Sequence, residues 1–256
     1  MRKLLIIGIG AGHRDHITMQ AMKALNEVDV FFAVDKGSDK QDLGRLREEI
    51  CAIYAAGRSY RVVAAPDPER DRAPADYEAA VRDWHEKRAA LFERMFESEL
   101  GEDQCGAFLV WGDPSLYDST LRIVADIHAR GVVPFTYAVI PGVSSVQALA
   151  AAHRIALNRI GGPVEITTGR NLREGRAGAS DDIVVMLDGE CSFNSIDPEG
   201  LDIYWGAYVG AEDEILIAGD LRKVAGDITR VRAEARARKG WIMDSYVLRR
   251  RDRGSR

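Results

Sequence analysis

The stretch Lys3-Leu4-Leu5-Ile6-Ile7-Gly8-Ile9-Gly10-Ala11-Gly12 opens the chain as an apolar run that ends in closely spaced glycines. A continuous apolar run of this kind is typical of a strand that is covered on both faces of a parallel sheet. Thr18 predicts the start of a helix, and residues 28–34 predict a second apolar strand that ends at Asp35. This strand–helix–strand order predicts an α/β protein with a mainly parallel sheet.

The rest of the N-terminal part continues the pattern. Three more strands are expected, at 61–64, 106–110 and 135–140, with helices at 41–60, 75–100 and 117–129. In the second half we expect a helix at 144–152, a polar stretch from 158 to 182, a strand at 183–187 and a strand pair at 202–209 and 214–218. That pair is predicted to be antiparallel, because its connection is too short for a crossover helix. The length allows one large domain or two modest ones, and the first 140 residues alone are expected to hold about five strands with helices between them.

Composition narrows the function classes. The 256 residues carry a formal charge of −5 at pH 7, with 46% hydrophobic and 29% charged residues, as is ordinary for a globular protein. The mild acidity argues against nucleic-acid binding. No apolar run approaches the roughly 20 residues of a membrane span, and glycines interrupt the first run too early for a secretory signal. Three widely separated cysteines without a CxxC pair suggest neither a metal site nor a disulfide framework. We therefore expect a cytoplasmic protein.

Three predicted strands end in turns of small residues. These turns are Gly8 to Gly12, Gly112-Asp113-Pro114 and Pro141-Gly142-Val143-Ser144-Ser145. Ligands of parallel sheets bind outside the carboxyl ends of the strands, where glycine lets the backbone approach a ligand closely. One glycine turn after a strand is most often only a turn, but three in one sheet predict a binding site.

The first loop does not fit the dinucleotide-binding fingerprint. That fingerprint is Gly-x-Gly-x-x-Gly, and the sixth position is His13 when counted from Gly8 and Asp15 when counted from Gly10. A phosphate-binding GxxxxGK[ST] loop is also absent from the sequence.

The ordered set of motifs resembles the cobalamin-type tetrapyrrole methyltransferases over essentially the whole chain. The set consists of the first glycine loop with Thr18, Trp111-Gly112-Asp113-Pro114, Ile140 to Ser145, and a later strand that holds Met186. The resemblance implies two α/β domains, residues 1–140 with a mainly parallel sheet and 141–256 with a mixed sheet. It also implies a cleft between them that binds S-adenosylmethionine, with a tetrapyrrole above it and no metal. The cofactor contacts that it implies are Ala11, Trp111, Gly112, Asp113, Leu116, Ser144, Ser145, Met186, Gly206 and Ala207. Without the resemblance, Met186 would be read as a core residue and Asp113 as a residue that stabilises its own turn.

Within this family, four further segments resemble the members that convert precorrin-5 to precorrin-6A. The segments are Phe31 to Lys36, the insertion around 64–104, Trp111 to Tyr117 and Trp241 to Tyr246. The resemblance implies that the macrocycle is methylated at C-1 and that acetate is released. It also implies that the protein is a homodimer. Acetate release needs water added to a ketone and carbon–carbon cleavage, for which a general base helps. Asp35 and Tyr117 are the candidate catalytic residues, with His13 as a further candidate.

A tetrapyrrole substrate of this kind carries many carboxylates, so a net-acidic protein must concentrate positive charge locally. Five arginines lie between residues 154 and 176, and arginine pairs bidentately with carboxylates. Arg170 and Arg173 are predicted to bind the substrate. The alternative, favoured equally, is that they belong to a solvated surface loop. The basic run Arg249 to Arg251, followed by Arg253 and Arg256, is expected to be a solvated terminus rather than a nucleic-acid or membrane arm.

Several other functions stay open at this point. Another tetrapyrrole methylase of the same pathway would share every cofactor turn, and so would a diphthamide-type methyltransferase that modifies a protein side chain. From different classes, an NAD-dependent oxidoreductase would need the dinucleotide fingerprint, and a non-catalytic corrinoid carrier would bind the tetrapyrrole without transferring a methyl group.

Overall fold

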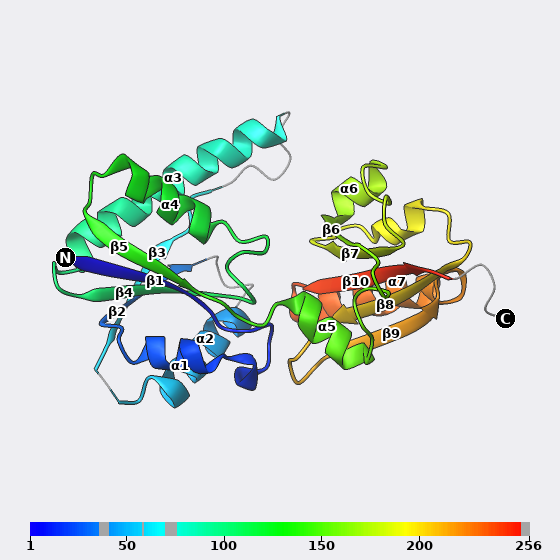
Figure 1. Cartoon of the computed structure of the whole chain (residues 1–256), viewed down its shortest axis with the longest axis horizontal. Coiled ribbons are helices and arrows are strands. Elements are labelled where there is room, and N and C mark those ends of the chain that lie inside the picture. Colours follow the sequence, from blue (N-terminus) through cyan, green and yellow to red (C-terminus); the bar gives the residue numbers. More distant parts are fainter. Residues whose placement is uncertain (36–40, 58, 70–75, 252–256) are drawn as a thin grey trace. The chain divides into compact units, whose positions relative to one another are not determined.

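The computed structural model describes residues 1–35, 41–57, 59–69 and 76–251. The chain forms two compact units, Met1–Ser144 and Ser145–Arg256, and each contains a five-stranded sheet (Figure 1). The first sheet is parallel and the second is mixed, so the predicted fold class of two α/β domains is confirmed.

The first sheet has the strand order β3-β2-β4-β1-β5. Its members are β1 (Arg2–Gly8), β2 (Val30–Asp35), β3 (Arg61–Pro66), β4 (Cys105–Val110) and β5 (Phe135–Ile140). All four strand pairs are parallel. The carboxyl ends of all five strands therefore lie at one edge, where the predicted glycine turns follow β1, β4 and β5.

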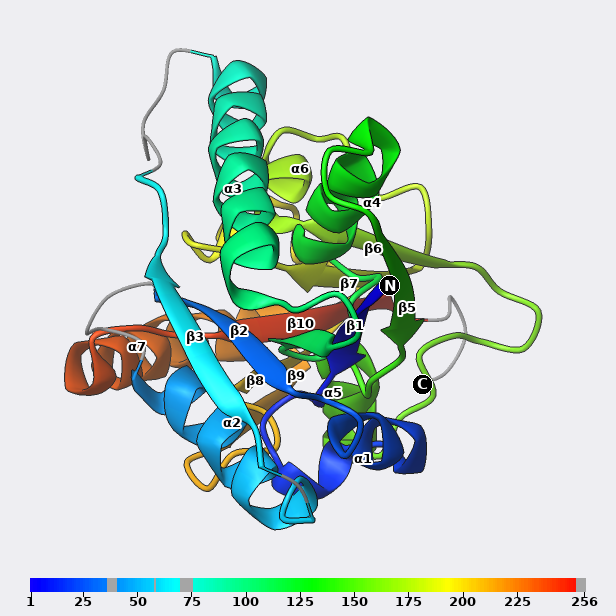
Figure 2. The same ribbon diagram turned by 90° about the vertical axis from the view of Figure 1, so that its left-hand side faces the viewer.

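Helices cover both faces of this sheet. Figure 2 shows α3 (Tyr77–Glu99) and α4 (Thr120–Arg130) on one side of the strands, with α1 (Met19–Leu25) and α2 (Gln41–Tyr54) on the other. A short 3-10 helix, η1 (Arg14–His16), precedes α1. The helix expected over 41–60 ends at Tyr54. Thr18 begins α1 as expected, because its hydroxyl accepts a hydrogen bond from Ala21 N at 3.0 Å.

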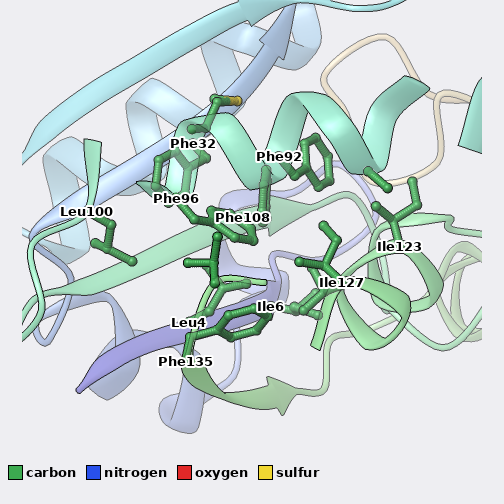
Figure 3. Close-up of a cluster of buried hydrophobic side chains, with 14 of the residues drawn as sticks. Leu4, Ile6, Phe32, Phe92, Phe96, Leu100, Phe108, Ile123, Ile127 and Phe135 are labelled. Carbon is green, nitrogen blue, oxygen red and sulfur yellow. The ribbon is translucent and has the colours of Figure 1, made fainter. Parts of the chain in front are cut away.

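The apolar side chains of β1 pack on both faces of the first sheet. Leu4 and Ile6 pack into the cluster under α3 and α4, whereas Leu5 and Ile7 pack into the cluster under α1 and α2. The first cluster is rich in aromatic rings, with the stacked pair Phe92 and Phe108 at 4.5 Å between centroids (Figure 3). Burying each such side chain contributes roughly 1.5–3 kcal/mol, so the sheet is held firmly between two helical layers.

The second sheet has the strand order β6-β7-β10-β8-β9. Its members are β6 (Val164–Thr168), β7 (Asp182–Met186), β8 (Leu201–Ala207), β9 (Ile215–Asp220) and β10 (Asp244–Arg250). Only β6 and β7 pair in parallel among the described strands of this sheet, and β8 and β9 are antiparallel as predicted. The helices of this unit are α5 (Ser145–His153), α6 (Gly169–Arg173), η3 (Ser192–Ser195) and α7 (Leu221–Lys239).

Besides the short η3, four elements of this unit have no counterpart in the prediction. The polar stretch 158–182 contains β6 and α6, while α7 and β10 lie beyond the last predicted strand. Helix α7 is hard to recognise because its polar residues dominate, and only a narrow stripe that includes Leu221, Ile228 and Ala235 is buried.

The expectation of a solvated basic terminus is wrong for its first residue, Arg249, whereas Arg250 and Arg251 are exposed. Arg249 and Arg250 are the last residues of β10. The Nε atom of Arg249 lies 2.5 Å from Oδ1 of Asp182, whose carboxylate is almost fully buried. A charge buried in this way needs its partner, so Arg249 belongs to the sheet. Arg253 and Arg256 lie outside the described residues.

Candidate functional site

The turns after β1 and β4 are joined by their backbones at the carboxyl edge of the first sheet. Gly10 and Gly112 form an isolated antiparallel bridge, in which Gly112 N donates to Gly10 O at 2.8 Å and Gly10 N donates to Gly112 O at 3.4 Å. Both glycines have positive φ angles, 86° and 71°, which favour glycine over any residue with a side chain.

The turn after β5 approaches the other two turns even more closely. A Cβ atom on Gly142 would lie 2.2 Å from Gly112 O, and one on Gly8 would lie 2.6 Å from Gly142 N. Backbone atoms cannot move aside as the end of a side chain can. Glycine at these two positions is therefore required by the contact between the three turns.

Asp113 connects two of the turns. Its Oδ2 accepts a hydrogen bond from Gly142 N at 2.9 Å, and its Oδ1 accepts from Ser115 N at 2.8 Å and from the Ser115 hydroxyl. Partial burial alone would raise the pKa of Asp113, but the hydrogen bonds from Ser115 and Gly142 outweigh it and lower the pKa. Asp113 thus stabilises its own turn, as the alternative interpretation held, and also the turn after β5.

The remaining predicted cofactor residues of this unit surround the same turns. Ala11 and Ser144 are buried, at 3% and 4% exposure. Leu116 is partly buried, and its N donates to Asp113 O at 3.2 Å. The Nε1 atom of Trp111 is buried and has no hydrogen-bond partner within the described residues. An indole N–H in that state can donate to an acceptor on a ligand.

The two catalytic candidates follow strands of the same sheet. Tyr117 comes seven residues after the end of β4 and is 45% exposed, with a φ of 52°. A positive φ is strained for a bulky residue and is often retained where function requires it. Asp35 is the last residue of β2, in register with Pro66 of β3, and its side chain lies outside what the structure describes.

In the second unit, Met186 and Gly206 lie on the strands that flank β10. Ser245 of β10 is in register with both residues. Directly opposed residues share one face of a sheet, so Met186 and Gly206 face the same side. A Cβ atom on Gly206 would lie 2.6 Å from Cδ1 of Leu149 in α5, the helix that begins with Ser145. Ala207 is fully buried.

A buried polar network, which the sequence analysis did not detect, lies beside the end of β7. Arg232 of α7 pairs with Asp244, with Nε 2.9 Å from Oδ2, and donates to the backbone O of Asp188 at 2.7 Å. The Asp188 carboxylate accepts from the Tyr246 hydroxyl at 2.7 Å and from Ser192 N at 2.6 Å. The network fixes the turn that follows Met186. Scattered polar residues give no local signal for it, because its members come from four different segments.

The two arginines predicted to bind substrate lie on α6. Arg170 and Arg173 are both exposed. Arg173 forms an ion pair with Glu190. The predicted contact of these arginines with a substrate stays a prediction.

The described residues hold neither a metal-binding cluster nor a membrane-spanning helix. No group of three or more His, Cys, Asp or Glu side chains in these ranges is arranged to hold a metal ion. No helix in the same ranges is long and apolar enough to cross a membrane. All three cysteines are buried and unbridged.

Comparison with known proteins gives concordant matches. The family model of the tetrapyrrole (corrin/porphyrin) methylases matches residues 3–225. A precorrin-6A synthase [deacetylating] from Sinorhizobium sp is 51% identical over 249 residues, which cover 97% of this chain and 95% of that protein.

Solved structures of other proteins share the fold of this chain. The crystal structure of a cobalamin synthesis related protein, CobF, from Corynebacterium diphtheriae has a TM-score of 0.85 and 38% identity, and covers 98% of this chain and 100% of that chain. A uroporphyrin-III C-methyl transferase from Thermus thermophilus, solved with S-adenosyl homocysteine, shares the fold at a TM-score of 0.61 and 17% identity, over 96% of this chain and 97% of that one.

Proposed function

This chain belongs to the tetrapyrrole (corrin/porphyrin) methylase family, and from that membership we propose that it is an S-adenosylmethionine-dependent C-methyltransferase of cobalamin biosynthesis. It converts precorrin-5 to precorrin-6A by methylating C-1 and releasing acetate. The observation that carries the proposal is the 51% identity, over nearly both full lengths, to the precorrin-6A synthase [deacetylating] from Sinorhizobium sp.

The residues at the predicted cofactor positions fit S-adenosylmethionine. The three interlocked turns present backbone groups at the carboxyl edge of the first sheet without side-chain bulk. The unpartnered Trp111 N–H is a donor for an adenosyl or carboxylate oxygen. We propose that these turns, with Ala11, Leu116 and Ser144, bind S-adenosylmethionine together with Ser145, Met186, Gly206 and Ala207 of the second unit.

When bound, the cofactor supplies an activated methyl group on a sulfonium. The chain's own residues then have mainly to align the reacting carbon with that methyl group, and correct positioning alone contributes up to roughly 7–11 kcal/mol. For acetate release, we propose that the carboxylate of Asp35, or Tyr117 in its phenolate form, accepts the proton of the attacking water. Tyr117 is 45% exposed, which supports a place for it at a site that water reaches.

The carboxylates of the substrate need positive partners. We propose Arg170 and Arg173 as two of them, supported by their exposure side by side on α6. The pair between Arg173 and Glu190 lies at the surface, and such pairs are worth only about 0–1 kcal/mol. A substrate carboxylate can therefore replace Glu190 at little cost.

The deciding experiment is an incubation of the purified chain with precorrin-5 and methyl-labelled S-adenosylmethionine, followed by mass spectrometry. We expect one labelled methyl group in the macrocycle and one equivalent of free acetate. Methylation without acetate would favour another methylase of the pathway. Macrocycle binding without any methyl transfer would favour a corrinoid carrier, and transfer to a protein would favour a diphthamide-type enzyme.

We further propose a cytoplasmic homodimer. The family resemblance supports the dimer, and membership of a family of biosynthetic enzymes supports the cytoplasm. Sedimentation of the purified chain gives the oligomeric state directly. A monomer at micromolar concentration would contradict the proposed dimer.

A further inference from the structure

The backbone pairing between β2 and β4 stops before either strand ends. Their pairing covers only Val30 to Phe32 with Gly106 to Phe108, whereas β2 continues to Asp35 and β4 to Val110. The carbonyl of Leu109 is thereby left without a strand partner on the β2 side. The opening lies at the carboxyl edge of the sheet, the same edge that carries the three glycine turns.

Arg47 of α2 reaches into this opening. Its Nε donates to Leu109 O at 3.1 Å, in place of the missing strand. Within the part of the chain that the structure describes, the two terminal nitrogens of Arg47 have no hydrogen-bond or ion-pair partner. Burial lowers the pKa of Arg47, nearby Asp118 opposes this shift, and Arg88 adds to it. The guanidinium is thus a partly buried cation whose charge is incompletely compensated.

The neighbouring charged groups are already engaged. Arg88 of α3 is 6% exposed, pairs with Asp67 at 2.9 Å, and lies over the Trp84 ring at 4.5 Å. Asp118 accepts a hydrogen bond from Thr120 N at 2.7 Å, at the start of α4. Arg88 is buried and its charge is paired with Asp67, whereas Arg47 has no carboxylate partner among the described residues. Arg47 is therefore the arginine of this cluster whose charge is left for a ligand.

We propose that Arg47 binds a carboxylate of the substrate, an acetate or propionate side chain of the tetrapyrrole, where β2 and β4 part. The inference rests on the proposed function and adds a specific anchor in the first unit. A guanidinium held through Nε presents its two terminal nitrogens as a fork, which matches the two oxygens of a carboxylate. Tyr117, the neighbour of Asp118 in sequence, is the candidate for the second reaction step. Arg47 would thus orient the macrocycle beside that residue.

The test compares Arg47→Met with Arg47→Lys and with Arg45→Met as matched control. Arg45 lies on the same helix, is 75% exposed in its side chain, and pairs only with Glu49 among the described residues. The probes are uroporphyrin III, which carries eight carboxylates, and its neutral octa-amide. Their affinities for the full chain are measured by calorimetry, together with the affinity for S-adenosylhomocysteine.

We expect Arg47→Met to weaken uroporphyrin III binding about 10- to 100-fold, as the loss of a charge-assisted hydrogen bond predicts. Arg47→Lys should recover part of the loss, and Arg45→Met should bind like the unmodified chain. Affinities for the octa-amide and for S-adenosylhomocysteine should not change with Arg47→Met.

Each contrary result has a distinct meaning. Equal uroporphyrin III affinity for Arg47→Met and the unmodified chain overturns the anchor and leaves the proposed function standing, even if the melting temperature falls. Equal losses for uroporphyrin III and the octa-amide also overturn it, because the effect would not depend on carboxylates. Failure of the unmodified chain to bind either tetrapyrrole overturns the tetrapyrrole function and the anchor together.

Discussion

Gly142 lies where the three turns of the first unit converge, and its hydrogen atom occupies a space too small for a methyl group. We predict that Gly142→Ala lowers the free energy of unfolding by roughly 1–3 kcal/mol, because the added Cβ would meet Gly112 O at 2.2 Å. It should also abolish detectable S-adenosylhomocysteine binding, since the turns would have to separate. Chemical denaturation and calorimetry measure the two effects.

Gly44→Ala is the matched control for this substitution. Gly44 lies inside α2 with nothing within 4 Å of the added methyl group. Alanine is the better helix former by about 0.8–1.0 kcal/mol, so this variant should be slightly more stable and should bind the cofactor product normally. If both variants behave alike, the close contact of the turns is not what requires glycine.

The Asp113 carboxylate gives the second prediction at this scale. Asp113→Asn should lower the free energy of unfolding by about 1–2 kcal/mol at pH 7. Both carboxylate oxygens accept hydrogen bonds, from Gly142 and Ser115, and an amide has only one oxygen that can accept. The pKa of Asp113 is lowered in the folded chain. Its carboxylate therefore stabilises the fold above the unfolded pKa of about 4, and that contribution is lost as the pH falls through the folded value.

The stability difference between the unmodified chain and Asp113→Asn should accordingly shrink below about pH 4. Thermal melts between pH 2 and 7 would follow this trend. Asp126→Asn is the control, because Asp126 is an exposed residue of α4 that pairs with Arg130 on the next turn. A difference for Asp113→Asn that is constant over the whole range would contradict the assignment.

At the scale of elements, the second unit depends on a buried ion pair between α7 and β10. Arg232 and Asp244 are about 8% and 5% exposed in their side chains. Removing one partner leaves the other charge buried and alone, which costs roughly 3–5 kcal/mol. We therefore predict that Arg232→Met strongly lowers the free energy of unfolding, measured by urea denaturation.

The double variant Arg232→Met with Asp244→Asn should lose less than the sum of the two single variants, since no lone charge remains. Arg230→Met on the same helix is the control, because Arg230 forms only exposed pairs with Asp227 and Glu234 in the described part of the chain. Its effect should stay within about 0.5 kcal/mol. Additive losses in the double variant would show that the two side chains act independently.

At the scale of the whole molecule, ligand-linked stability separates the function classes. A ligand that binds only the folded chain, at 100 times its Kd, stabilises it by about 2.7 kcal/mol. For a chain of 256 residues this corresponds to a rise in Tm of roughly 5–10 °C. We expect that rise with S-adenosylhomocysteine and none with NAD. The opposite pattern would support an oxidoreductase.

Much of the fold was predictable because its signals are local. The apolar runs of β1, β2, β4 and β5 identify buried strands by composition alone, and Thr18 marks the start of α1 through its capping hydroxyl. The family resemblance, carried by the ordered glycine and proline turns, is confirmed by the match over residues 3–225.

The unpredicted elements have weak local signals. Strand β10 ends in arginines that look like a solvated terminus, and only the buried Asp182 beside Arg249 shows otherwise. Helix α7 carries so many charges that its narrow apolar stripe is obscured. Tertiary contacts, rather than propensity, stabilise both elements.

The amino-acid sequence by itself determined the α/β class, the five strands of the first unit and membership of the family, since periodicity and turn chemistry depend on neighbouring residues. The tertiary structure alone decided that Gly8 and Gly142 exclude any side chain, that Arg232 is buried beside Asp244, and that Arg47 donates to Leu109 O where the pairing of β2 and β4 stops. These contacts join residues far apart along the chain. Local spacing carries no information about such contacts, because they exist only once the strands are placed side by side.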